Sequence, residues 1–352
     1  MSKKLSNFLL VVVSIFFLFI SFEIILSFFP VRESSNTILQ TKENILHLEK
    51  NREFQYSKGE FFQIKFKKKV NNFGYTSDID YKIGEGQILV IGDSYVEAFQ
   101  INNKKTFHHL LGEDLKVNVY QMSHSSSQLA QYYEFAKFGI EKFNPKLLIF
   151  NFVSGDSLTE TPGKYSFNLK TKKTYLREDE MPKKTFFIKT ILKSNVVRYF
   201  YYNFELQSKL RFLFVERNKS FKANIPCDIK ENEVIKSQKS INLFLELINK
   251  FKKNNIDILI VFDYMREEIY DNYINSCKNE SFASLERKYF IEQVKKYKIM
   301  FIDLKESFMK NYEINNKKFN FDIDHHWNEK GHEVVFKTIK NYLTTNYDLS
   351  KL

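Results

Sequence analysis

Residues 88–94 read Ile88-Leu89-Val90-Ile91-Gly92-Asp93-Ser94. The apolar run predicts a strand with both faces covered, as in a parallel sheet between two helical layers. The glycine that follows predicts a tight turn into a helix. This stretch therefore predicts a strand–turn–helix unit with the Ser94 hydroxyl at the carboxyl end of a strand, where open parallel sheets place their active sites.

The same alternation continues along the chain. Further short apolar runs occupy residues 117–122, 147–153, 256–262 and 299–302. Helical patterns lie between them, at residues 95–100 with 106–115, 129–143, 235–254 and 284–297. Strands that alternate with helices predict an α/β fold with a parallel, doubly wound sheet and helices on both faces, a three-layer α/β/α arrangement.

The N-terminal segment predicts the compartment. Lys3 and Lys4 precede an almost uninterrupted apolar run over residues 8–29, and about 20 apolar residues suffice to cross a bilayer. The basic residues favour a cytoplasmic N-terminus. The run ends in bulky residues rather than in the small residues of a cleavage site, which favours an uncleaved signal anchor. Residues 1–30 are thus predicted to be a cytoplasmic tip and transmembrane anchor, with the bulk of the chain outside the cytoplasm.

Residues 31–84 are polar and mixed, and we expect a stalk with a leading strand. Residues 44–50 predict a short helix, and residues 61–70 alternate as a strand does. Residues 85–347 form the predicted main domain, interrupted at about 158–232 by a helical insertion. The aromatic, basic part of this insertion, residues 186–216, has three readings: a lid, a membrane-facing patch or an added layer of core. Aromatic stripes at helical spacing usually pack inward, which favours the core.

Composition limits the partners. The 352 residues include 54 Lys and Arg against 42 Asp and Glu, a net charge of +12. Such a charge suits a polyanion or an anionic membrane surface, but the lysines are scattered and no aromatic-basic binding motif occurs, so we expect no nucleic-acid partner. Cys227 and Cys277 lack metal-ligand spacing. A disulfide and two free thiols both remain open for them.

A second chemical motif lies near the C-terminus: Asp324-His325-His326-Trp327-Asn328. A histidine two residues after an aspartate can act as a base while the carboxylate fixes its tautomer. With Ser94, the motif supplies the three groups of a serine hydrolase. His325, His326 and His332 could also be considered as metal ligands, but no H-E-x-x-H-like spacing occurs. We therefore expect neither a metal nor another cofactor.

These motifs resemble those of the SGNH/GDSL hydrolase superfamily over residues 72–343, in particular its membrane-anchored bacterial branch with the DHHW-type and alginate O-acetylation-type proteins. The matching stretches, in chain order, are Ile91-Gly92-Asp93-Ser94 for the first block, Gln131 in a Ser-rich second block, residues 152–157 for the third, and Asp324-His325-His326-Trp327-Asn328 with Gly331-His332 for the last. The resemblance implies a flavodoxin-like sheet.

The resemblance also implies a mechanism. Ser94 would attack an ester carbonyl, His326 would take its proton and return it to the leaving alcohol, and Asp324 would orient the imidazole. The oxyanion would be held at Ser94, Ser123 and Asp156. Water or a sugar hydroxyl would then resolve the acyl-enzyme, which gives an esterase or an acyltransferase.

Two positions depart from the family. Ser123 stands where the family has a glycine, but its N–H is retained. Asp156 stands where the family has an asparagine whose amide donates to the oxyanion, and an ionised carboxylate has no donor. Asp156 would have to be protonated, displaced or replaced by another donor, such as Ser125 or Ser154. The impaired alternative is a non-catalytic protein that binds a glycan in the same cleft.

Two choices of residue remain open at this level. Gly155-Asp156-Ser157 is a second Gly-Asp-Ser, but it follows the third strand and leads into a loop, so Ser94 is the preferred nucleophile. His325 competes with His326 because Asp322-Ile323-Asp324-His325 has the D-x-x-H spacing of other family branches. The following Trp327 and Asn328 favour His326.

The sequence and the resemblance together predict an extracytoplasmic serine esterase or O-acyltransferase acting on acylated envelope carbohydrate, at the bacterial inner membrane and periplasm. One alternative is a catalytically impaired binding or scaffold protein of envelope polysaccharide assembly, with protein partners in that assembly. A weaker alternative is a lysophospholipase-like lipid esterase, suggested by the membrane tether and the aromatic insertion.

Overall fold

The computed structural model describes residues 3–40, 45–153, 158, 165–177, 186–214, 231–264, 267–270 and 282–352. Two compact units share the chain. The anchor unit comprises Met1–Ser35, Glu53–Lys68 and Pro182–Lys222. The sheet unit comprises Asn36–Arg52, Lys69–Met181 and Ala223–Leu352. Each unit is built from segments that lie far apart in the sequence.

A five-stranded parallel sheet forms the centre of the sheet unit. Its strands are β5 (Ile88–Gly92), β6 (Val119–Ser123), β7 (Leu147–Phe152), β10 (Asp257–Phe262) and β11 (Met300–Asp303). Their order is β11-β10-β7-β5-β6, which is the flavodoxin-like order of a doubly wound sheet. The strand order reverses beside β5, so the carboxyl ends of β5, β6 and β7 flank the point where ligands bind in such sheets. The predicted α/β class and all five predicted strands are confirmed.

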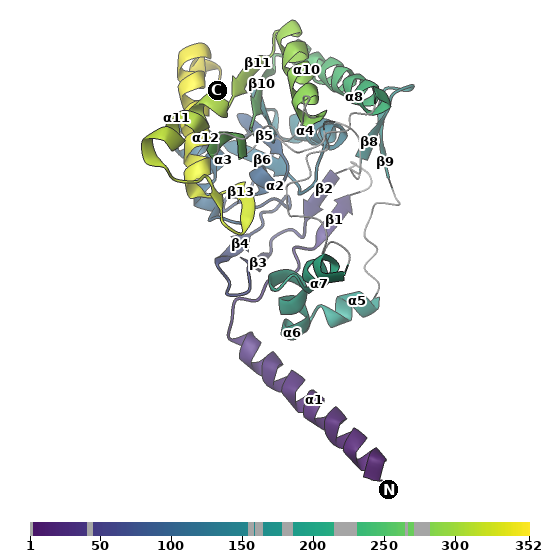
Figure 1. The fold of residues 1–352 in the computed structure, drawn as a ribbon. Helices are drawn as coiled ribbons and strands as arrows, with labels where there is room; N and C mark the ends of the chain where they lie inside the picture. The colour runs from purple at the N-terminus through teal and green to yellow at the C-terminus, as the bar shows by residue number, and fades with distance from the viewer. Residues whose placement is uncertain are drawn as a thin grey trace. The chain divides into compact units, whose positions relative to one another are not determined.

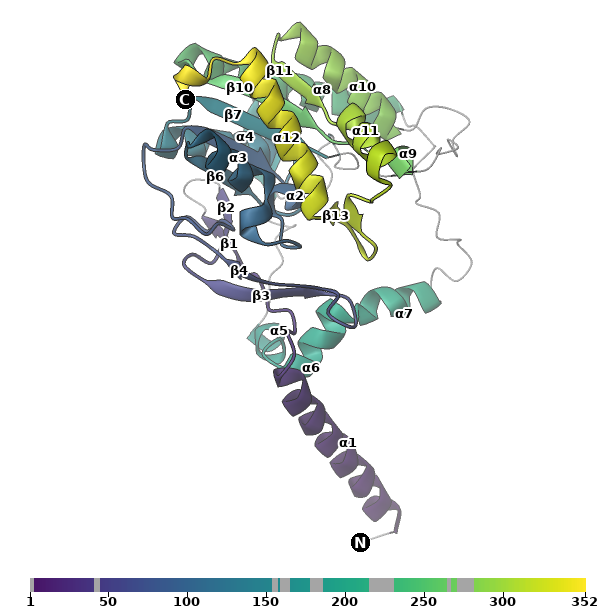
Figure 2. The same cartoon turned by 90° about the vertical axis from the view of Figure 1, so that its left-hand side faces the viewer.

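Helices cover both faces of this sheet (Figure 1). One face carries α3 (Phe107–Leu115), α11 (Lys305–Asn315) and α12 (Glu329–Asn346); the other carries α4 (Leu129–Phe143), α8 (Glu231–Asn249) and α10 (Phe282–Lys296). Figure 2 shows α3 and α12 in front of the sheet and α8 and α10 behind it. Successive side chains of β5 point to opposite faces of the sheet and pack in two separate cores. Val90 packs on the side of α12 and Leu89 on the side of α4. A fully buried aliphatic side chain of this kind contributes about 1.5–3 kcal/mol.

Gly92 is required because the end of β5 and the helix after it approach each other closely. A Cβ at this position would lie 2.2 Å from Cγ2 of Val96. Val96 belongs to the one-turn helix α2 (Ser94–Glu97), whose N-cap is Asp93. The missing side chain therefore lets the chain turn directly from β5 into α2, which puts Ser94 at the edge of the sheet.

Residues 44–50 were expected to form a helix, and this prediction is wrong. The structure has β2 (Ile45–Leu48), which pairs antiparallel with β1 (Thr37–Gln40). All four residues of β2 are buried, whereas a helix would place part of so short a segment in solvent. An isolated segment of this length cannot stabilise a helix, so tertiary burial and the ladder with β1 decide its conformation.

Smaller elements complete the sheet unit. The two-stranded pairs are β8 (Tyr165–Asn168) with β9 (Lys173–Leu176) and β12 (Asn320–Phe321) with β13 (Asp324–Trp327). Short helices are α9 (Glu267–Tyr270), η1 (Asn103–Lys105), η4 (Lys250–Asn254) and η5 (Leu349–Lys351). The β12–β13 hairpin is the element that carries the C-terminal motif.

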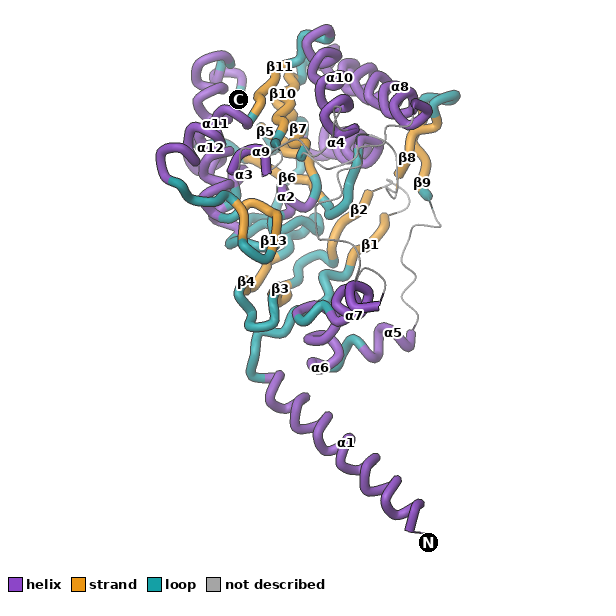
Figure 3. Tube along the Cα trace, viewed as in Figure 1, coloured by secondary structure: helices purple, strands orange, loops and turns teal. Residues whose placement is uncertain are grey.

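The anchor unit contains α1 (Lys3–Ser27) and a hairpin of β3 (Glu53–Lys58) and β4 (Ile64–Lys69). It also contains α5 (Phe186–Ile191), α6 (Asn195–Arg198), the π-helical segment η3 (Tyr199–Asn203) and α7 (Leu206–Phe214). Figure 3 shows this helical series. In the described part of the chain, α1 alone is long and apolar enough to cross a membrane.

Candidate active site

The Asp324–His326 pair is formed within β13. Asp324 Oδ1 accepts a hydrogen bond from the His326 backbone N–H at 2.9 Å and a second, short one from the ring Nδ1. The Asp324 carboxylate is buried, so its interaction with the ring is protected from solvent. With Nδ1 as the donor, the neutral ring carries its lone pair on Nε2, the position that a general base needs.

The second ring nitrogen of His326 is available. Nε2 is buried and has no hydrogen-bond partner among the residues that the structure describes. The ring of Tyr95, in α2, packs against the imidazole with centroids 4.7 Å apart. A buried polar atom without a partner is unfavourable in a folded protein and is often explained by function. His326 therefore has the arrangement of a general base whose Nε2 can accept a proton.

Helix α2 lies against the β13 hairpin. The Tyr95 hydroxyl donates to the His325 carbonyl oxygen at 3.0 Å, and the Tyr95 ring meets the Trp327 ring edge-on at 5.1 Å. Ser94 is the residue before Tyr95 and begins α2. In this structure Ser94 Oγ donates to Asp93 Oδ2 at 3.4 Å rather than to His326. Catalytic hydrogen bonds are commonly long in ligand-free enzymes and tighten when substrate binds.

Asp263 was missed by the sequence analysis. It directly follows β10, is fully buried, and accepts a hydrogen bond from the Trp327 indole Nε1–H at 3.0 Å. Trp327 is the neighbour of His326, so Asp263 holds the strand that carries His326. A polar residue immediately after an apolar strand is the same signal that identified Ser94, and it would have identified Asp263 as well.

Ser123 ends β6 directly opposite Gly92 in the parallel register. Its side chain is buried and donates to Gln121 Oε1 at 2.5 Å. The predicted oxyanion residues Ser94 and Ser123 thus lie at the ends of adjacent strands, on one edge of the sheet. The Ser123 hydroxyl is already hydrogen-bonded to Gln121. Only the backbone at Ser123 and in the loop after it can therefore contribute hydrogen bonds at this edge of the sheet.

Glu97 connects α2 to the loop after β6. Its buried carboxylate accepts hydrogen bonds from the Ser125 backbone N–H at 3.1 Å and, at short distance, from the Ser125 hydroxyl. Both donors of Ser125 are directed to Glu97, so Ser125 is not placed to replace the amide that Asp156 lacks. No sequence pattern indicated Glu97, because nothing in its own segment distinguishes it from an exposed helix residue.

The remaining predicted residues fall into two groups. His332 belongs to the core: its Nδ1 accepts a hydrogen bond from the Phe107 backbone N–H at 3.3 Å, and the two rings stack. Within the described ranges, no group of three His, Cys, Asp or Glu side chains could hold a metal ion. Other predictions concern residues outside the described part of the chain: Ser154, Asp156, Ser157, Cys227 and Cys277.

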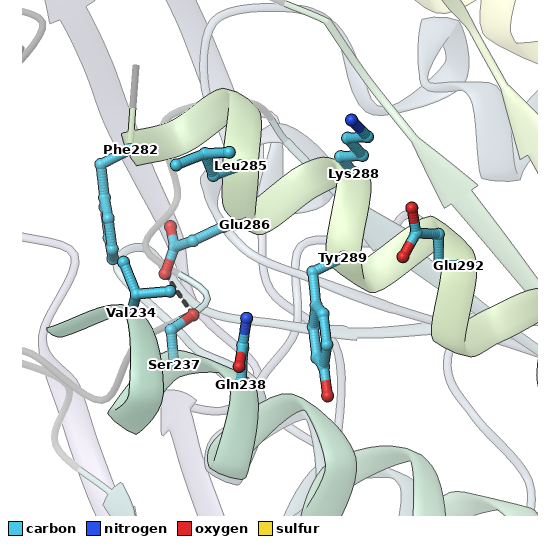
Figure 4. Close-up of a pocket in the computed structure, with 9 residues that line it drawn as sticks. All are labelled: Val234, Ser237, Gln238, Phe282, Leu285, Glu286, Lys288, Tyr289 and Glu292. Carbon is cyan, nitrogen blue, oxygen red and sulfur yellow. Dashed lines mark hydrogen bonds between the residues drawn. The ribbon is translucent and has the colours of Figure 1, made fainter. Parts of the chain in front are cut away.

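A separate cavity of about 230 Å³ lies between α8 and α10, on the opposite face of the sheet from Trp327. Figure 4 shows Glu286 of α10 and Ser237 of α8 facing each other in it. The Ser237 hydroxyl donates to the Glu286 carboxylate. Burial raises the pKa of Glu286 to about 7.

This shift predicts a pH-dependent stability. The folded protein binds the Glu286 proton more tightly than the unfolded chain does. The contribution of Glu286 to the free energy of unfolding therefore falls as pH rises from about 4.5 to about 7. We expect Glu286→Gln to raise the free energy of unfolding at pH 8 by roughly 2–3 kcal/mol and to leave it nearly unchanged at pH 4.5. Thermal unfolding of both proteins at the two pH values measures the difference. The exposed Glu292→Gln, at the same cavity, is the matched control; an equal gain at both pH values for Glu286→Gln would contradict the assignment.

Comparison with known proteins gives one family match. Residues 227–351 match the family described as SGNH hydrolase-like domain, acetyltransferase AlgX. No protein of curated function matches the chain. Among solved structures, a member of the lipolytic protein G-D-S-L family from Veillonella parvula is 10% identical, with a TM-score of 0.40 over 73% of this chain and 98% of that one. An acetyl xylan esterase is 14% identical, with a TM-score of 0.41 over 73% and 99%.

The matched residues 227–351 include β10, β11 and the β13 hairpin with the Asp324–His326 pair. They supply two of the five parallel strands and the acid–base half of the candidate site. This part of the chain is therefore similar to the SGNH hydrolase-like domain of the AlgX family.

Proposed function

We propose that the protein is a membrane-anchored, extracytoplasmic serine esterase or O-acyltransferase acting on acylated carbohydrate of the cell envelope. One observation carries the proposal: His326 pairs through Nδ1 with buried Asp324, keeps Nε2 free, and packs against the helix that begins with Ser94. The acyl-transfer chemistry is supported by the AlgX-type match, whose description names an acetyltransferase, and the carbohydrate substrate rests on the resemblance to alginate O-acetylation-type proteins.

The proposed reaction has two halves. In the first, His326 Nε2 takes the Ser94 hydroxyl proton while Oγ bonds to the acyl carbon, and the tetrahedral intermediate then expels the alcohol, which leaves with that proton. In the second, Nε2 takes a proton from water or a sugar hydroxyl while its oxygen bonds to the acyl carbon, and the tetrahedral intermediate then expels Ser94 Oγ, which takes the proton back from Nε2. Asp324 stabilises the imidazolium that exists between these steps.

The oxyanion is assigned to backbone N–H groups at Ser94 and Ser123. Both residues are on the carboxyl edge of the sheet, at the ends of β5 and β6. Asp156 takes the place of a side-chain donor, and the loss of one such donor lowers the rate by about two to three orders of magnitude. We therefore propose a slow enzyme, or one whose acceptor sugar supplies a hydrogen bond to the intermediate.

The proposed topology keeps α1 as an uncleaved anchor. Leu26 and Val31, at the end of the apolar segment, are buried together with Val196 of α6. A cleavage after residue 30 would remove Leu26 from this cluster and expose Val196. The N-terminal lysines then place the short tip in the cytoplasm and the sheet unit outside the cytoplasm.

Covalent labelling tests the nucleophile. We expect a fluorophosphonate probe to modify the full-length protein in detergent at Ser94, located by peptide mass spectrometry, because only an activated serine reacts. His326→Ala should abolish the labelling, whereas Ser157→Ala should retain it. Modification of Ser157 in the wild-type protein would overturn the assignment of Ser94.

A non-catalytic glycan-binding or scaffold role is the second candidate, and the aspartate at position 156 favours it. Absence of labelling on the folded protein would support this role and direct the work to glycan-binding and envelope-assembly partners. For the esterase, release of acetate rather than fatty acid from envelope material would distinguish a carbohydrate ester from the lysophospholipase-like alternative.

A further inference from the structure

The anchor unit has an exposed apolar groove formed by α6, η3 and α7. The groove has a volume of about 460 Å³. Its apolar lining consists of Val196, Val197, Phe200, Tyr201, Leu206 and Leu210. The side chains of Tyr201 and Leu210 are 53% and 42% exposed. An exposed apolar concavity of this kind marks a surface that a partner covers.

The groove is fixed to the apolar helix α1. Glu23 of α1 accepts hydrogen bonds from the Ser194 hydroxyl at 2.7 Å and from the backbone N–H groups of Asn195 and Val196 at 2.6 and 3.1 Å. The carboxylate thus satisfies the first N–H groups of α6, which otherwise lack partners. Phe62 extends the contact by packing its ring against both Phe29 and Tyr199, at 5.8 Å in each case.

These bonds determine the depth of α6 in the membrane. Glu23 lies one turn before the end of α1, and the apolar sequence continues past it to Phe29. A carboxylate on a membrane-spanning helix is tolerated where it is hydrogen-bonded or reaches the interface. Because Glu23 is bonded to the start of α6, α6 must lie at the same depth, at the boundary between acyl chains and headgroups.

The composition of the helical series suits that depth. Residues 186–214 contain five Lys or Arg against one acidic residue, together with many Phe and Tyr. Phe187 of α5 is 71% exposed, in line with the exposed side chains of the groove. Aromatic and basic residues on one in-plane helical segment are typical of the interface of an anionic bilayer. The reading of this segment as an added layer of core does not fit these exposures.

We propose that α5, α6, η3 and α7 lie in the plane of the bilayer, in the leaflet from which α1 emerges, and that lipid acyl chains fill the groove. This inference rests on the proposed function only in that α1 crosses the membrane. The anchor unit would then hold the protein at the membrane surface by two contacts, a spanning helix and an in-plane helical series.

Lipid quenching tests the proposal on the full chain. A single cysteine is introduced by Leu210→Cys in a Cys227→Ser, Cys277→Ser background, labelled with bimane, and reconstituted in vesicles of phosphatidylethanolamine and phosphatidylglycerol. We expect a loss of bimane fluorescence when the acyl chains are brominated. Phe16→Cys in α1 reports on the spanning helix. Ile314→Cys, an exposed apolar position in α11 of the sheet unit with 71% exposure, is the matched control.

Quenching at residues 16 and 210 with little at 314 would support the proposal. Quenching at residue 16 alone would overturn the proposal while leaving the anchor intact. The probe at residue 210 would then lie either in water or against a second copy of the chain, and dimer cross-links would identify the second case. Equal quenching at 210 and 314 would also overturn it, because exposure alone would then explain the signal. Absence of quenching at residue 16 would refute the anchor itself and the in-plane placement with it.

Discussion

Replacement of Ser94 by alanine is expected to lower ester hydrolysis by about 10⁴- to 10⁶-fold, as the loss of the nucleophile does in serine hydrolases. The hydroxyl is held at the carboxyl end of β5 by the turn that Gly92 permits, and its neighbour Tyr95 packs on the His326 ring. Without Oγ no acyl-enzyme forms, and only the residual effect of the oxyanion-binding backbone remains. Release of the alcohol from a chromogenic acetyl ester measures the change.

The control for this experiment is Ser157→Ala, because Ser157 ends the second Gly-Asp-Ser of the chain. We expect its activity to match that of the wild-type protein. Unfolding of the Ser94 variant is monitored through the fluorescence of Trp327, the single tryptophan of the sequence, which is buried in the core. A large loss in the Ser157 variant, with activity retained after Ser94→Ala, would move the nucleophile to the third block.

Replacement of His326 by alanine should have an effect of similar size, about 10⁴- to 10⁶-fold, whereas His325→Ala should change the rate little. The two neighbours differ in their contacts. His326 receives the buried Asp324 carboxylate on Nδ1 and presents a free Nε2. The side chain of His325 is exposed, and only its backbone carbonyl takes part, as the acceptor of the Tyr95 hydroxyl.

His325→Ala is therefore a matched control, since it removes an adjacent imidazole and keeps the bond from Tyr95 to the main chain. Steady-state kinetics of both variants on the same ester decide between the histidines. If His325→Ala caused the larger loss, the D-x-x-H spacing that starts at Asp322 would describe the site instead, and β13 would have to present its other face to the substrate.

The sheet was predictable because its signal is local. Short apolar runs, such as residues 88–91 and 147–153, alternate with helical segments along the chain, and the buried strands of a doubly wound sheet need such runs. β2 was predicted incorrectly because its four residues carry no period of their own. Its burial on both sides depends on segments that only the folded chain brings together.

The partners of the site residues were not predictable in the same way. Glu97 binds Ser125 across 28 positions, and Asp263 binds the Trp327 indole across 64. Neither pair has a spacing that a sequence pattern records, because the strand order of the sheet, not the distance along the chain, brings them together. The same holds for Glu23, whose bonds to the start of α6 span more than 170 positions.

The sequence by itself determined the α/β class, the apolar N-terminal helix and the residue types of a serine hydrolase site, since these depend on hydrophobic periodicity and short motifs. Only the tertiary structure showed that the His326 ring packs on Tyr95 of α2 while the His325 side chain is exposed. Asp324 and His326 lie on one face of β13 because alternate residues of a strand point the same way, but which face of β13 meets α2 is set by packing between segments 230 residues apart.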